Sequence, residues 1–109
     1  LTGMAIDANA MRPVLGNITG GLSGPAINPV ALRMVYEASK AVAVPVIGMG
    51  GIMSGRDAAE FLLAGARAVM VGTATIADPP ACVKIIGELD AYLDAKHMSA
   101  REICGALKV

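Results

Sequence analysis

Two pairs of small residues, each directly after an apolar segment, could bind an anion. "VPVIGMGG" ends in Gly50-Gly51, and "AVMVGT" ends in Gly72-Thr73. Glycine has no Cβ, so its backbone can approach a phosphate closely and its N–H can donate to an oxygen. The hydroxyl of Thr73 can add another donor. Sharp turns alone would explain single glycines, but two such pairs, one structural repeat apart, favour anion binding.

The elements that must position these pairs follow from hydrophobic spacing and helix-start signals. Ser54 and Asp57 form a capping-box pattern, and Asn28 before Pro29 is typical of a helix N-terminus. The strand from Val44 does not alternate polar and apolar residues, so we expect both of its faces to be buried. The predicted strands are Val44–Met49 and Ala68–Val71, and the predicted helices are Pro29–Val42, Ser54–Gly65, Asp78–Lys96 and Ser99–Leu107.

Two of these helices carry an apolar stripe at helical spacing, which predicts the side that faces the core. The first stripe is Ala31, Met34, Val35, Ala38, Ala41 and Val42, and the second is Cys82, Ile85, Ile86, Leu89 and Leu93.

The order strand, helix, strand, helix predicts an α/β fold with parallel strands. In such folds ligands bind at the carboxyl ends of the strands, and in a (β/α)8 barrel the loops after strands 7 and 8 often hold a phosphate. The positive end of the helix that follows each loop would add to the attraction. Residues 1–27 are harder to interpret: "GMAID" could end another strand, and "RPVLGNITGGLSGPAINP" is too rich in Gly, Pro and Asn for regular structure.

Composition narrows the class of protein. The chain has 109 residues, 55% of them hydrophobic, which fits a piece of a larger body. Zero formal net charge, no Trp and three other aromatic residues argue against nucleic-acid and membrane binding. Cys82 and Cys104 form no C-x-x-C pair, so we expect core cysteines in a reduced, cytoplasmic protein. No secretory signal is visible, and we assign no catalytic or metal-ligating residue; His97 lies at a predicted helix end.

Three motifs in order resemble one family. "GMAID" with "GNITGGLSGPAINPVALRMVYEASKAV", then "VPVIGMGGIMSGRDAAEFLLAGARAVMVGTA", resemble the C-terminal part of dihydroorotate dehydrogenase, most closely the NAD-linked class 1B. The resemblance fades after about Lys96. It implies that residues 1–109 are the C-terminal βα units of a single TIM-barrel domain, and therefore an incomplete barrel.

The resemblance also implies a cofactor and partners. It implies non-covalently bound FMN, oxidation of dihydroorotate to orotate in pyrimidine synthesis, and contacts to FMN from Gly24, Gly50, Gly51, Gly72 and Thr73. Class 1B further implies a second subunit with FAD and an iron–sulfur cluster. The family's catalytic cysteine, its lysine near the flavin and its substrate asparagines have no counterparts here, so we expect the isolated chain to be inactive.

Two alternatives remain open from the residues. One is another phosphate- or flavin-binding barrel enzyme, such as a pyrimidine reductase, although the long "GGLSGPAINP" loop argues against a simple sugar-phosphate barrel. The other is a non-catalytic βα fragment that associates with itself, because an open sheet edge favours pairing with another chain. A homo-oligomer is the expected assembly.

Overall fold

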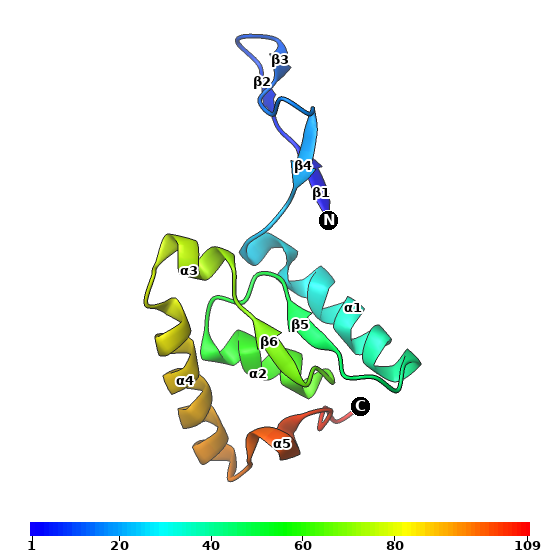
Figure 1. Cartoon of the computed structure of the whole chain (residues 1–109), viewed down its shortest axis with the longest axis vertical. Coiled ribbons are helices and arrows are strands. Elements are labelled where there is room, and N and C mark those ends of the chain that lie inside the picture. The colour runs from blue at the N-terminus through cyan, green and yellow to red at the C-terminus, as the bar shows by residue number, and fades with distance from the viewer.

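A computed structural model describes all residues 1–109 and consists of a helical body with a narrow arm (Figure 1). The arm holds the N-terminal residues and projects away from the body, which gives the molecule extents of 55 × 33 × 21 Å. The radius of gyration is 16.4 Å, against about 13 Å for a compact domain of this size. The excess reflects the arm, which packs mainly on itself.

The body is built around two short parallel strands, β5 (Ile47–Met49) and β6 (Ala68–Met70), paired with Gly48 opposite Val69. Parallel strands at this point confirm the predicted βα order. The other elements are β1 (Thr2–Met4), β2 (Ile6–Asp7), β3 (Arg12–Pro13), β4 (Thr19–Gly21), η1 (Pro25–Ile27), α1 (Asn28–Ala41), α2 (Gly55–Leu63), α3 (Thr73–Ala77), α4 (Ala81–Lys96) and α5 (Ala100–Ile103).

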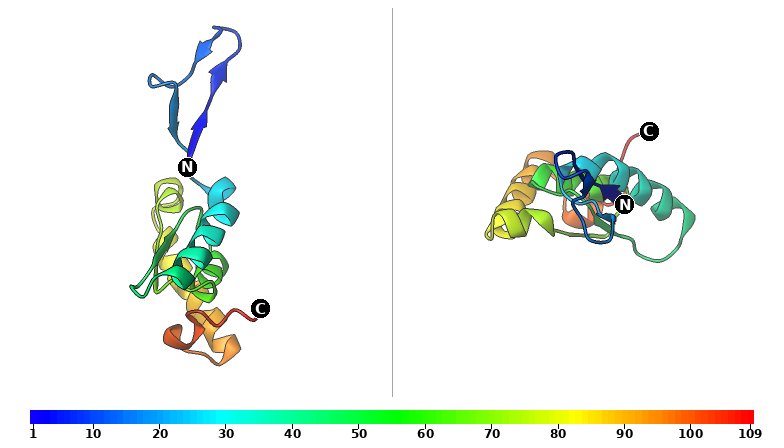
Figure 2. Two further views of the ribbon diagram at one scale, coloured as in Figure 1. Left: turned by 90° about the vertical axis from the view of Figure 1, so that its right-hand side faces the viewer. Right: turned by 90° about the horizontal axis from the view of Figure 1, so that it is seen from above.

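Helices cover only one face of this strand pair, as the two views of Figure 2 and the burial pattern agree. Gly48 is buried towards the helices, whereas Ile47, Met49 and Met70 are each more than half exposed on the other face. The expectation that both faces of the first strand would be buried is therefore wrong for this chain. The uncovered face is what a sheet that belongs to a larger body would present.

The core lies between α1, α2, α4 and the covered face of the strands. Phe61 on α2 is fully buried and packs with Ala58, Ile85 and Val35. A second small cluster joins α2, α4 and α5 around Ile103. The predicted stripes are only partly correct, because Met34, Val42, Cys82 and Ile86 are exposed.

The helix-start predictions have mixed outcomes. Ser54 and Asp57 form the predicted capping box on α2. The same motif starts α5, where the Ser99 backbone N–H donates to Oε2 of Glu102 and the Ser99 hydroxyl accepts from the Glu102 backbone N–H. Hydrogen bonding by Ser99 to the Glu102 carboxylate, first from its backbone and then from its side chain, lowers the pKa of that carboxyl. Asn28, by contrast, does not cap α1. It is the first residue of the helix, after Ile27 at the cap position, and its side chain donates to the carbonyl of Gly51.

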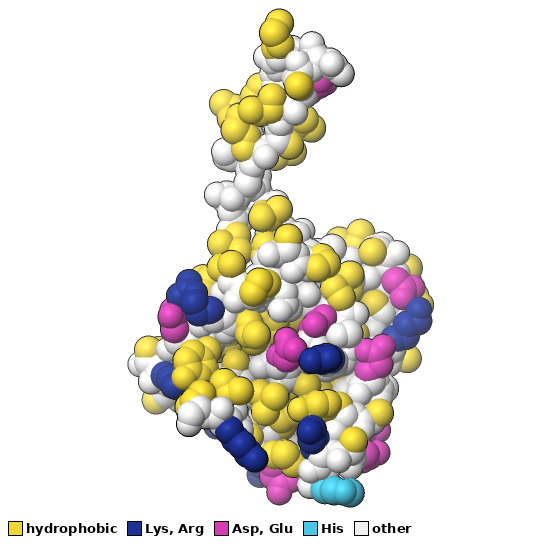
Figure 3. Space-filling view, turned by 180° about the vertical axis from the view of Figure 1, so that it is seen from behind, with side chains coloured by type: hydrophobic (Ala, Val, Ile, Leu, Met, Phe, Trp, Pro, Cys, Tyr) yellow, Lys and Arg dark blue, Asp and Glu magenta, His cyan; other side chains and the backbone are white.

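The arm agrees with the strand expected at "GMAID" and corrects the interpretation of "RPVLGNITGGLSGPAINP" as irregular. β1 pairs antiparallel with β4, and β2 pairs antiparallel with β3 at the tip. Asp7 closes the tip by accepting from the amides of Asn9 and Ala10 at 3.0 Å each. Short two-stranded pairs tolerate Gly and Pro because no neighbouring strand requires their donors. Figure 3 shows a mainly apolar arm, with the charged side chains gathered on the body.

Candidate phosphate-binding site

The loops that carry the two small-residue pairs lie side by side. β5 and β6 run in the same direction with Met49 opposite Met70, so the residues after each strand emerge at the same edge. A cavity of about 470 Å³ opens there. Its lining includes all five residues expected to bind the cofactor: Gly24, Gly50, Gly51, Gly72 and Thr73. Three segments that are distant in the sequence therefore meet at one hollow.

The backbone amides around this hollow are free to bind a ligand. The N–H groups of Gly50, Gly51, Gly72 and Thr73 donate to no backbone or side-chain acceptor in the chain. Backbone donors are strong hydrogen-bonding groups and are almost always paired with protein, water or ligand. Four unpaired donors around one cavity are the arrangement that backbone anion sites use.

Internal packing also requires glycine at part of the site. Gly51 has φ +69°, and a Cβ there would lie 2.5 Å from the carbonyl oxygen of Gly24. Gly50 has φ +126°, and its Cβ would lie 2.6 Å from that of Ala31. The chain's own packing therefore already accounts for these two glycines.

Gly72 is different from the other two. A Cβ at this position would meet no heavy atom within 4 Å, and its φ of −113° is one that other residues adopt. No steric contact within the chain requires glycine there. Gly72 therefore leaves open space beside the backbone at the wall of the cavity.

The short helix α3 was not predicted from the sequence, and it begins at the site. Gly72 precedes its first residue, and the carbonyl of Gly72 accepts from the amides of Thr75 and Ile76. The amides of Thr73 and Ala74 stay unpaired at its start. Five residues, of sequence TATIA, are too few to show helical periodicity, so no pattern could have revealed this helix.

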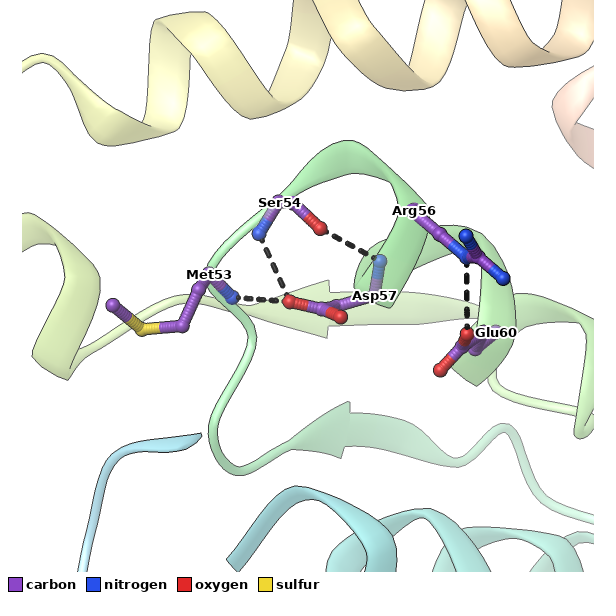
Figure 4. A network of polar contacts seen from close by, with 5 residues as sticks. All are labelled: Met53, Ser54, Arg56, Asp57 and Glu60. Carbon is purple, nitrogen blue, oxygen red and sulfur yellow. Dashed lines mark hydrogen bonds and ion pairs between the residues drawn. The ribbon is translucent and has the colours of Figure 1, made fainter. Parts of the chain in front are cut away.

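The N-terminus of the longer helix α2 is already occupied by two of the chain's own carboxylates, of which Figure 4 shows Asp57. Asp57 accepts from the amides of Met53 at 2.9 Å and Ser54 at 3.1 Å. Glu88 on α4 accepts from the amide of Gly55 at 2.6 Å. Because these carboxylates neutralise the positive end of α2, the attraction expected from the helix after Gly50-Gly51 is largely used internally.

No charged side chain lines the cavity. Its polar groups are backbone amides and carbonyls, together with the hydroxyls of Thr73 and Ser23. Sequence reasoning missed Ser23, although it stands next to Gly24 in the "GGLSG" motif. An anion bound here would be held by neutral donors. Its binding would then depend on several well-directed hydrogen bonds and not on a positively charged side chain.

Other residues with chemical potential lie apart from the cavity. Cys82 is exposed and Cys104 partly exposed, both as free thiols, so the expectation of two core cysteines is wrong for Cys82. His97 ends α4 in a left-handed conformation with φ +53°. No three His, Cys, Asp or Glu residues lie together as a metal site would require. None of the helices has both the length and the apolar character needed to cross a membrane.

Parallel βα units with unpaired backbone amides at the strand ends define an α/β protein with a candidate anion site at the carboxyl edge of its strands. The family model described as dihydroorotate dehydrogenase matches residues 1–93. The catalytic subunits of dihydroorotate dehydrogenase B (NAD(+)) from Citrifermentans bemidjiense and Geobacter metallireducens are 61% and 59% identical over the whole chain. That of Bacteroides fragilis is 53% identical over the same extent. The chain belongs to the dihydroorotate dehydrogenase family.

A solved structure agrees with this assignment. The dihydroorotate dehydrogenase of Eimeria tenella, determined in complex with ferulenol, matches 95% of the chain with a TM-score of 0.77 and 29% identity. The match covers 29% of that protein, and the chain spans 36% of the length of each of the three relatives named above. The C-terminal position of this match within the relatives stays a prediction.

Proposed function

We propose that this chain supplies the phosphate-binding portion of an FMN site in a dihydroorotate dehydrogenase of the NAD-linked class. The single observation that carries the proposal is the group of unpaired amides at Gly50, Gly51, Gly72 and Thr73 around one cavity. The identity of the relatives supports the choice of enzyme, and the geometry of the cavity supports the choice of ligand group.

The residues present fit a phosphoryl group. Amides from two loops can donate to it from two sides, and the open space at Gly72 lets it approach the backbone. The Thr73 hydroxyl adds a donor. Gly24 lies beside Thr73 in the lining of the cavity, since a Cβ added to Gly24 would lie 3.7 Å from Cγ2 of Thr73. Backbone amide donors suit a phosphate that must stay bound through turnover, because they are fixed in place and do not change their charge near neutral pH.

The proposed reaction is the oxidation of dihydroorotate to orotate in pyrimidine synthesis. The substrate loses one proton and one hydride, and bound FMN supplies the chemistry that accepts the hydride. This chain's residues contribute by holding the phosphate end and so fixing the position of the cofactor. The proton acceptor and the substrate contacts are proposed to come from parts of the enzyme outside residues 1–109, and we therefore expect no turnover by the isolated chain.

The exposed surfaces support a body larger than this chain. Only 17 of the 109 residues are buried, and the outer face of β5 and β6 carries exposed apolar side chains. Further βα units of a TIM barrel would cover that face. A subunit that carries FAD and an iron–sulfur cluster would pass the electrons to NAD, and a homo-oligomer is the expected assembly of the catalytic subunit.

The test uses the complete gene product, expressed and purified with its flavin. We expect a yellow protein whose extracted flavin is FMN, and orotate formation when dihydroorotate and an electron acceptor are added. A colourless protein that cannot be reconstituted with FMN would overturn the proposal. Reduction of pyrimidines without orotate formation would instead favour the pyrimidine-reducing alternative.

A further inference from the structure

The side chain of Asn28 makes contacts that neither helix capping nor core packing explains. Asn28 is the first residue of α1 and is partly buried. Its Nδ2 donates to the carbonyl oxygen of Gly51 at 3.2 Å and lies 3.5 Å from that of Gly50. One side-chain amide thus holds both carbonyls of the glycine pair, across 22 and 23 residues of sequence.

These contacts set the direction of two amides. In a trans peptide the C=O and the next N–H belong to one rigid plane and point in opposite directions, and the chain has no cis peptide. Holding the Gly50 carbonyl towards Asn28 therefore turns the Gly51 N–H away from it. Holding the Gly51 carbonyl does the same for the N–H of Ile52. Neither N–H has an acceptor in the chain, and Gly51 and Ile52 line the cavity whereas Asn28 does not.

The glycine pair needs such an anchor, because glycine backbone adopts more conformations than that of any other residue. Gly50 and Gly51 both have positive φ, a region from which glycine readily moves to other conformations. Asn28 is itself well fixed. Its backbone N–H donates to the carbonyl of Pro25, the first residue of η1. A Cβ added to Gly51 would lie only 3.0 Å from the Cβ of Asn28, so the two residues are close together.

We propose that Asn28 is a positioning residue, which holds the carbonyls of Gly50 and Gly51 so that the amides of Gly51 and Ile52 face the phosphate cavity. This inference rests on the proposed function, because it names the bound group as the phosphate of FMN. Asn28 touches neither cofactor nor substrate, and it acts only through the orientation of the loop.

The test compares FMN with riboflavin, which has the same ring system without the phosphate. Apoprotein of the complete gene product is titrated with each flavin, and binding is followed by quenching of flavin fluorescence. For Asn28→Ala we expect the Kd of FMN to rise about tenfold, or about 1.4 kcal/mol, and the Kd of riboflavin to stay within twofold. The matched control is Asn17→Ala, on the arm, where the asparagine is exposed and its side chain makes no hydrogen bond.

Each result has a distinct meaning. Equal losses for both flavins would show a merely structural role, and no loss for either would show that the loop needs no anchor; both overturn the proposal. If the unaltered protein binds the two flavins equally or not at all, the proposed function itself fails. Asn28→Asp, which places an acceptor against two carbonyls, should weaken FMN binding more than Asn28→Ala.

A measurement on the unaltered protein covers the case in which the variants do not fold. Hydrogen exchange of the Gly51 and Ile52 amides should slow when FMN binds and should change little with riboflavin. Unchanged exchange at both amides with FMN would overturn the inference without any substitution.

Discussion

Replacement of Gly72 by alanine separates ligand binding from folding. The structure places no heavy atom within 4 Å of the new Cβ, so the chain accepts the methyl group without a steric clash. Alanine also restricts the unfolded chain more than glycine does. The free energy of unfolding should therefore change by less than about 1 kcal/mol.

Binding should respond differently, because the methyl group would enter the space where the phosphate approaches the backbone. A displaced phosphate loses good geometry to the amides of Gly72 and Thr73. Hydrogen bonds to a charged group are worth about 1.5–3 kcal/mol each, so loss of one such bond predicts a rise of about 10- to 150-fold in the Kd of FMN.

Gly51→Ala is the matched comparison, and it should damage both properties. Its Cβ would lie 2.5 Å from the Gly24 carbonyl oxygen, and its φ of +69° disfavours alanine. We expect a loss of about 1–3 kcal/mol in stability. The assay is urea unfolding of the complete apoprotein together with FMN titration. The reasoning would be refuted if Gly72→Ala bound FMN as tightly as the unaltered protein, or if it lost as much stability as Gly51→Ala.

Three further predictions concern stability. Gly48→Ala would place a Cβ 2.6 Å from the buried ring of Phe61, so urea unfolding should show a loss of about 1–3 kcal/mol, and an unchanged midpoint would contradict the packing. In Gly55→Ala the added Cβ would lie 2.4 Å from Cβ of Glu88 on α4. A similar loss of stability is expected in the same assay, and an increase in stability would count against that contact. The pKa of the Glu102 carboxyl is lowered by its hydrogen bonds, so its stabilising contribution is present above the unfolded value of 4.5 and disappears as pH falls through the folded pKa. Hydrogen exchange can follow how the stability of α5 falls between neutral and acidic pH. In Glu102→Gln this dependence on pH should become weaker, and an unaltered pH profile would show that the carboxylate is not responsible.

The parts of the fold that could be predicted from the sequence are those that depend on residues close together in the chain. The capping box at Ser54 and Asp57 needs only two residues at fixed spacing, and the structure confirms it. Parallel pairing of β5 and β6 follows from alternating strands and helices, and it brings Gly50 and Gly72 to one edge. Their shared cavity was thus expected from the sequence, whereas their contact with FMN stays a prediction.

The remaining features depend on tertiary contacts that no local pattern encodes. Asn28 has the sequence context of a helix cap, yet contact with the glycine loop draws its side chain away. The segment "RPVLGNITGG" supplies β3 and β4 of an antiparallel arm, although its Gly, Pro and Asn content suggests a loop. Met34 and Ile86 lie on predicted core stripes but are exposed, because helix spacing reports a buried face only where a neighbouring element covers it.

The most direct test of the account is a crystal structure of the complete gene product with FMN bound. The account predicts phosphoryl oxygens within about 2.7–3.2 Å of the amide nitrogens of both Gly51 and Thr73, one from each loop. A phosphate held by only one of the two loops, or bound elsewhere through charged side chains, would contradict it.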